Sequence, residues 1–186
     1  MPNIILPKKI VPITTTPERP LFFLAGPIRG GGDWQHAMAW ELLQRIKDVQ
    51  IACPSRWTAE HPLHEYFYEP FSQAPNRQLH WERHYMEQSS GLRGGHGCLI
   101  FWLPLESKES PHPGPEPYAM DTRREIGKYT AFMQTHGANL VVGGDKAFFG
   151  LSVILDELAD AAGADTFEFH EDMGDLADAA IKVAQR

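Results

Sequence analysis

The sequence lacks the features that mark several broad classes of protein. It has two cysteines, Cys53 and Cys98, and each lies in an apolar run, so we expect buried free thiols rather than a disulfide framework or a metal pair. No apolar run approaches the roughly 18 residues that a membrane-spanning helix needs. There is also no long basic run, and the net charge is −7, which argues against binding to a nucleic-acid backbone.

The N-terminal segment does not have the pattern of a signal peptide. Its first residues, MPNIILPKKIVP, are interrupted by prolines and contain no continuous apolar core. We interpret residues 1–19 as an extended arm outside the core and residues 20–186 as a single domain. With 42% hydrophobic residues, an ordinary share, the chain is expected to be a cytoplasmic globular protein with neither nucleic acid nor a membrane among its partners.

Apolar segments alternate with helical patterns along the domain. The patterns predict strands at 21–26, 49–54, 97–104, 138–144 and 165–170, and helices at 33–48, 76–90, about 122–136, 149–162 and 173–185. This alternation predicts an α/β fold: a doubly wound, five-stranded parallel sheet, in an order such as 2-1-3-4-5, with helices on both faces. Ligands bind such sheets beyond the carboxyl ends of the strands, so we expect the site in the segments after the first, third and fourth strands.

The segment GPIRGGG, which includes Arg29, follows the first expected strand. It is neither the G-x-G-x-x-G fingerprint nor a phosphate-binding loop, since no Gly-Lys-Ser/Thr follows. The glycines either form a flexible turn or let the backbone approach a small ligand closely. The position after the first strand favours close approach to a ligand.

Two histidine-containing segments are weaker candidates for a functional site. His80 and His84 lie four residues apart on an expected helix, a spacing that can hold zinc, but Trp81 stands where the metalloprotease motif needs glutamate. No metal is therefore expected there. The loop WTAEHPLHEYFY at 57–68 is rich in aromatic residues, which either stack on a base or fill the edge of the core.

The segment DTRREIG, at 121–127, opens a helix and allows two interpretations. Thr122 and Glu125 have the spacing of a capping box, in which the glutamate only completes the start of the helix. Alternatively, the positive end of the helix dipole, together with Arg123 and Arg124, keeps Glu125 ionised. An ionised carboxylate in a partly closed cleft is the nucleophile that covalent glycosyl transfer requires.

A set of motifs occurs in a fixed order over roughly residues 20–145: FLAGPI, then Trp81-Glu82, then IFWLP, then TRREIG. Together they resemble the FLAGP…FWLP…T-x-x-E-I-G branch of the nucleoside 2-deoxyribosyltransferase family. The resemblance implies a flavodoxin-like fold and a homo-oligomer. It also implies exchange of the base of a 2'-deoxynucleoside for a free nucleobase through a covalent deoxyribosyl-enzyme, without a metal or an organic cofactor.

The resemblance also implies roles for individual residues. The nucleophilic glutamate of the family stands three residues after a threonine and two before a glycine, which matches Glu125 between Thr122 and Gly127. The turn that lines the base pocket in the family corresponds to Gly26, Pro27 and Ile28. Further candidates for shaping or closing the pocket are Arg29, Trp57, Phe101, Trp102, Pro104, Tyr118, Thr122 and Arg123.

The chain departs from the family at the group that protonates the leaving base. Many members have an acidic residue at the start of the third strand, where this chain has Gly97 and Cys98. The acidic residue six positions before the nucleophile falls on Ala119. Asp121 and Glu82 are therefore the two candidates for the proton donor.

Other functions fit the same motifs. Distant relatives hydrolyse nucleotides and hold a 5'-phosphate at the start of this helix, where Arg123 and Arg124 stand here. A hydrolase acting on the N-glycosidic bond of a nucleoside or nucleotide is therefore one alternative. A nucleotide-sensing module without catalytic activity is the other.

Overall fold

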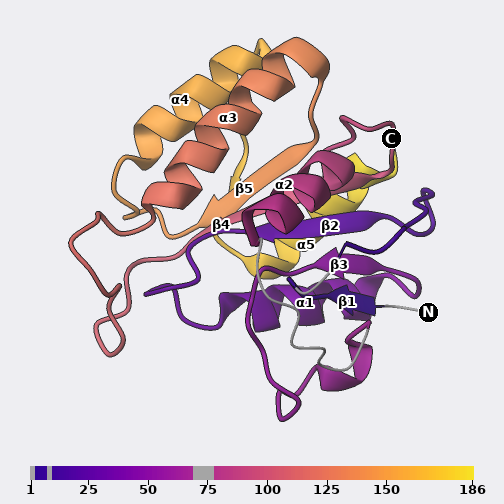
Figure 1. The fold of residues 1–186 in the computed structure, drawn as a ribbon. Coiled ribbons are helices and arrows are strands. Elements are labelled where there is room, and N and C mark those ends of the chain that lie inside the picture. Colours follow the sequence, from indigo (N-terminus) through magenta and orange to yellow (C-terminus); the bar gives the residue numbers. More distant parts are fainter. Residues whose placement is uncertain (1–2, 8–9, 69–77) are drawn as a thin grey trace.

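The computed structural model describes residues 3–7, 10–68 and 78–186. They form an all-parallel sheet of six strands in the order β1-β3-β2-β4-β5-β6 (Figure 1). The strands are β1 (Asn3–Ile5), β2 (Leu21–Ala25), β3 (Gln50–Ala52), β4 (Gly97–Leu103), β5 (Leu140–Gly144) and β6 (Phe169–His170). The helices are α1 (Trp34–Arg45), α2 (Gln78–Ser89), α3 (Met120–His136), α4 (Leu151–Ala162) and α5 (Met173–Ala184), with a 3-10 turn at His64–Tyr66.

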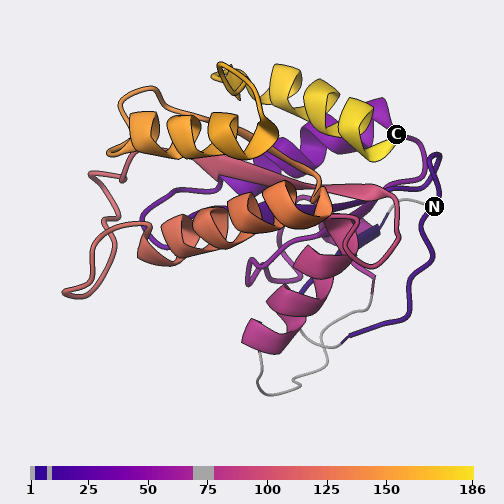
Figure 2. The same ribbon diagram turned by 90° about the horizontal axis from the view of Figure 1, so that it is seen from above.

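The sheet is covered by helices on both faces (Figure 2). Alternate residues of β4 point to opposite faces, because successive side chains of a strand alternate: Ile100 joins the core under α1 and α5, and Phe101 joins the core under α2, α3 and α4. All residues of β4 are buried, as expected for the central strand. The five predicted strands lie in the predicted 2-1-3-4-5 order, so the doubly wound arrangement is confirmed for them.

Part of the N-terminal segment, Ile4, Ile5, Leu6 and Val11, belongs to the core, so the predictions of five strands and of an arm wholly outside the core are wrong. Residues 3–5 form a sixth strand that pairs with β3, where Ile4 lies opposite Ile51. Ile4 has no exposed surface, and Val11 exchanges hydrogen bonds with the hydroxyl of Tyr85 on α2. The prolines around this segment suggested an extended arm, but the partner strand that buries it lies more than forty residues along the chain.

The burial of the arm predicts a measurable contribution to stability. Replacing Ile4 with alanine is expected to lower the free energy of unfolding by about 3 kcal/mol, because it leaves a cavity in the core under α1 and α5, to which Ile4 belongs. Urea denaturation measures this loss. Ile10 is the matched control, since its side chain is 49% exposed and its replacement by alanine is expected to change stability by no more than about 0.5 kcal/mol. Equal effects of the two substitutions would contradict the packing of β1.

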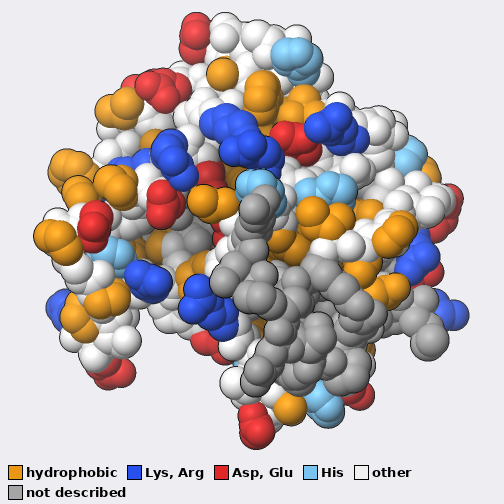
Figure 3. All heavy atoms as spheres, viewed as in Figure 1, with side chains coloured by type: hydrophobic (Ala, Val, Ile, Leu, Met, Phe, Trp, Pro, Cys, Tyr) orange, Lys and Arg blue, Asp and Glu red, His pale blue; other side chains and the backbone are white. Residues whose placement is uncertain are grey.

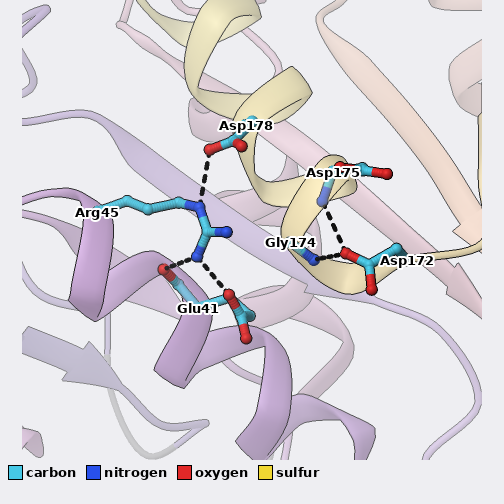
Figure 4. Close-up of polar contacts among 6 residues, drawn as sticks. All are labelled: Glu41, Arg45, Asp172, Gly174, Asp175 and Asp178. Atoms are coloured by element: carbon cyan, nitrogen blue, oxygen red, sulfur yellow. Dashed lines mark hydrogen bonds and ion pairs between the residues drawn. The ribbon is translucent and has the colours of Figure 1, made fainter.

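The last helix is tied to α1 by a group of polar contacts (Figure 4). Arg45 donates one hydrogen bond to Asp178 on α5, at 2.7 Å, and another to the carboxylate of Glu41 one turn earlier on α1. Asp172 caps α5 by accepting hydrogen bonds from the backbone amides of Gly174 and Asp175. These contacts add to the apolar packing that holds α5 against the sheet.

The structure also bears on several smaller predictions. Cys53 and Cys98 are buried free thiols, as expected, and burial raises the pKa of each. The expected strand at 165–170 is shorter and covers only Phe169–His170. The expected start of α2 at Asn76 lies outside the described residues. None of the helices formed by the described residues has the length and apolar character needed to cross a membrane.

Candidate active site

Loops from several strands meet at the carboxyl edge of the sheet. The glycine-rich loop after β2 is joined to the proline-rich loop after β4, because the backbone amide of Ser107 donates to the carbonyl of Gly30 at 2.7 Å. Tyr118 then donates its hydroxyl to the carbonyl of Pro104, which closes the proline-rich loop on itself. Figure 3 shows the surface hollowed between this loop, at the left of the view, and the body of the molecule. The predicted location of the site therefore coincides with a recess in the surface.

Gly26 has a packing role at the start of the first of these loops. A Cβ atom at this position would lie 2.5 Å from the carbonyl oxygen of Trp102 and 2.6 Å from the ring of Trp34. The next residue, Pro27, accepts a hydrogen bond from the indole nitrogen of Trp34 at 2.9 Å. The backbone and the ring approach so closely that a side chain does not fit at position 26, which explains why the residue is glycine. This packing positions the turn that includes Ile28, which is 38% exposed.

The capping-box interpretation of Glu125 is wrong. Helix α3 begins at Met120, and the residue before it, Ala119, adopts a left-handed conformation with φ of 59° and caps the helix without a side-chain hydrogen bond. Thr122 is therefore already inside the first turn, with its side chain buried, and Glu125 belongs to the second turn. A carboxylate in the second turn does not reach back to the free amides at the start of the helix. The position of Glu125 has to be explained in another way.

Glu125 is one of three carboxyl groups that act on one another electrostatically. The pKa of Glu125 is raised to about 7, first by burial and then by the negative charges of Glu82 and Asp121, whereas Arg124 and Lys128 oppose the shift. Asp121 and Glu125 lie on α3, and Glu82 lies on the neighbouring helix α2. Among the described residues, no group donates a hydrogen bond to the Glu125 carboxylate. The surroundings thus disfavour the ionised form of Glu125, contrary to the expectation that the start of the helix keeps it ionised.

The other two carboxyl groups differ from each other in their surroundings. Burial raises the pKa of Glu82, and the nearby charge of Asp121 adds to this effect, while a hydrogen bond of 2.8 Å from the Gln78 amide opposes it. Asp121 is exposed and pairs with Arg124 at 3.4 Å. Glu82 is thus the better placed of the two to hold a proton.

Arg123 is directed away from these carboxyl groups. Its guanidinium donates to the carbonyl oxygen of Phe149 at 2.5 Å and lies 4.5 Å from the centre of the Phe148 ring. These contacts fasten the start of α3 to the loop between β5 and α4. The expected electrostatic help from Arg123 to Glu125 is therefore not found, and only Arg124 and Lys128 supply it.

The remaining predicted pocket residues are distributed unevenly. Phe101 has no exposed surface and Trp102 only 8%, so both are core residues beneath the recess, one in each of the two cores. Pro104 and Tyr118 are partly exposed at the proline-rich loop, and Arg29 is exposed in the glycine-rich loop. Their positions are compatible with contact to a ligand.

Trp57 belongs to a separate aromatic group on the α1 side of the sheet. Its ring is 9% exposed and stacks on His61 with the ring centres 4.1 Å apart, and its indole nitrogen donates to Asp33. Of the two interpretations of the aromatic loop, filling the edge of the core describes Trp57 better. Asp33 and His36 were not predicted as site residues, although their spacing of three residues at the start of α1 was a usable signal in the sequence.

No protein-family model matches this chain, and the curated proteins compared with it include no match either.

Proposed function

We propose that this chain is a nucleoside 2-deoxyribosyltransferase, which exchanges the base of a 2'-deoxynucleoside through a covalent intermediate on Glu125. The observation that carries the proposal is the group of three carboxyl groups, in which Glu125 is partly buried, without a hydrogen-bond donor among the described residues, and has a pKa raised to about 7. A partly buried carboxylate that no donor stabilises is reactive towards an electrophilic carbon. The motifs that resemble the family place the nucleophile at the same residue.

In the proposed reaction, an oxygen of the ionised Glu125 attacks the anomeric carbon of the sugar. The bond from this carbon to the base nitrogen breaks, and its electron pair stays on the base, which takes a proton from a neighbouring carboxyl group. A second base then attacks the same carbon, displaces Glu125 and returns a proton to that carboxyl group. Each turnover therefore exchanges one base for another, and neither a metal nor an organic cofactor takes part.

We assign the proton donor to Glu82 rather than to Asp121. Burial favours the protonated form of Glu82, whereas Asp121 is exposed and paired with Arg124. The charges of two neighbouring carboxylates oppose each other, so one member of the group holds a proton while another is ionised. A nucleophile and an acid in adjacent positions are what the exchange requires.

The surroundings of the carboxyl groups favour a neutral nucleoside over a 5'-nucleotide. Arg123 is occupied by the carbonyl of Phe149 and the ring of Phe148, so it would have to leave both contacts to bind a phosphate. Glu82, Asp121 and Glu125 would also repel a phosphate held near them. The cytoplasmic location expected from the composition and the homo-oligomer implied by the family resemblance are part of the same proposal.

Chromatography of a simple mixture tests the proposed exchange. The purified chain is incubated with thymidine and free adenine at pH 7, close to the pKa of Glu125, so that the three carboxyl groups still share a proton. The expected result is deoxyadenosine together with thymine. Thymine without deoxyadenosine would replace the proposal with a hydrolase, and unchanged nucleosides and 5'-nucleotides would leave only the sensing module.

A further inference from the structure

A second group of ionisable residues lies at the carboxyl edge of the sheet, on the side covered by α1. It consists of Asp33, directly before α1, His36, in the first turn of α1, and His61, in the long segment after β3. Its packing partners Trp57 and Phe67 belong to the core under α1 and α5, whereas the residues around Glu125 belong to the core on the opposite face. The group is therefore separate from the three carboxyl groups.

The donor atoms of this group are spaced as metal ligands are. The Asp33 carboxylate lies 3.7 Å from Nδ1 of His36 and 3.5 Å from Nε2 of His61, and one donor atom from each of the three residues lies within 4.8 Å of the others. A zinc ion with nitrogen and oxygen ligands at about 2.1 Å separates neighbouring ligand atoms by about 3.4 Å in a tetrahedron. Small movements of exposed side chains are enough to bring the three donors to a common ion.

His61 supplies a second, independent observation. Its side chain is only 10% exposed, and its Nε2 atom is buried without a hydrogen-bond partner among the described residues. An unsatisfied buried polar atom costs stability unless a partner binds it.

The contacts around the group orient two of its members. The indole nitrogen of Trp57 donates to Oδ1 of Asp33 at 3.1 Å, which leaves Oδ2 directed to the two histidines. The backbone amide of Leu63 donates to Nδ1 of His61 at 3.2 Å, so the proton of a neutral ring lies on Nε2. Metal binding at Nε2 transfers this proton to Nδ1, and the Leu63 amide then loses its acceptor, so the metal–nitrogen bond has to outweigh one long hydrogen bond.

We infer that Asp33, His36 and His61 bind a divalent transition metal ion, of which zinc is the natural probe. Two imidazoles and one carboxylate suit zinc or its neighbours in the periodic table rather than calcium or magnesium, which prefer oxygen ligands. Water occupies the remaining coordination positions, since Asp33 and His36 are partly exposed. The ion fastens the 57–67 segment to the start of α1, and this role does not depend on the proposed transfer reaction.

Calorimetric titration tests the inference with the full-length, tag-free chain after treatment with a chelator. One zinc ion per chain is expected to bind, and a hundredfold excess over the dissociation constant is expected to raise the melting temperature by about 5 °C or more. His36→Gln and Asp33→Asn are expected to weaken binding at least about tenfold. Both replaced side chains are partly exposed, so the variants are expected to fold.

His64→Gln is the matched control, because His64 lies in the same segment, is exposed, and is not a member of the group. Zinc binding and the rise in melting temperature are expected to persist in it. Cobalt provides a further readout: bound beside the stacked pair of Trp57 and His61, it is expected to quench tryptophan fluorescence, and Trp57→Phe is expected to remove most of this change. Failure of the chain to bind zinc, or equal losses in His36→Gln and His64→Gln, would overturn the inference.

Discussion

Replacing Glu125 with glutamine is expected to reduce the rate of base exchange at least about a thousandfold. The amide keeps the size of the side chain but has no charge with which to attack the anomeric carbon. The measurement is kcat/KM for thymidine and adenine at pH 7. Mass spectrometry after an acid quench adds a direct readout, because the wild-type chain is expected to carry a deoxyribosyl group on Glu125 and the variant none.

Glu157→Gln is the control for this activity measurement. Glu157 lies on the exposed face of α4 and is not one of the three carboxyl groups around Glu125. Its replacement is therefore expected to leave both the base exchange and the covalent adduct intact. Retention of exchange by the Glu125 variant would mean that another residue is the nucleophile. A deoxyribosyl adduct found at Asp121 or Glu82 would identify which one.

The same substitution is expected to make the protein more stable at alkaline pH. The ordinary pKa of a glutamate, 4.5, applies to the unfolded chain, whereas the folded chain holds the pKa of Glu125 at about 7. Below pH 4.5 Glu125 is protonated in both the folded and the unfolded chain, so it does not change the free energy of unfolding. Between pH 4.5 and about 7 the unfolded chain loses the proton first, so the free energy of unfolding falls as the pH rises. Above 7 the full cost is present, and it amounts to as much as about 3 kcal/mol.

Glutamine at position 125 is never ionised, so the variant lacks this cost. Its free energy of unfolding is expected to exceed that of the wild type by up to about 3 kcal/mol at pH 8, and to equal it near pH 4. Urea denaturation at the two pH values measures the difference, with Glu157→Gln as the reference for an exposed glutamate. A variant that is less stable than the wild type at pH 8 would show that the charged form of Glu125 supports the fold, which would contradict the described surroundings.

Local sequence patterns predicted the main strands and helices, because each of them has a recognisable pattern within a short stretch of chain. The apolar run of β4 and the helical spacing in α1 need no information from elsewhere, so the order of the five predicted strands followed from the alternation alone. The strand β1 has three residues and becomes recognisable only beside β3. A strand of this length has no periodicity from which to predict it.

The candidate site was predictable in its location but not in its electrostatics. The rule that ligands bind beyond the carboxyl ends of parallel strands pointed to the loops that in fact meet there. The start of α3 was misjudged by two residues, since the capping spacing of Thr122 and Glu125 fits a helix that begins later than Met120. The approach of Glu82 to Glu125 depends on how α2 packs beside α3, which no local pattern contains.

The pairing of the N-terminal strand also decides how the sheet ends. On its outer side Ile4 is bridged to Phe67, and the amide of Tyr68 donates to the carbonyl of Ile4 at 2.9 Å, so part of the free edge of β1 is already occupied. The opposite edge is β6, which has two residues. A long, unpaired edge strand is a template on which a second chain can extend the sheet and start a fibril. Because β6 is short and the edge of β1 is partly occupied, little such template is left. We therefore expect this fold to resist strand-by-strand aggregation as long as β1 stays in place.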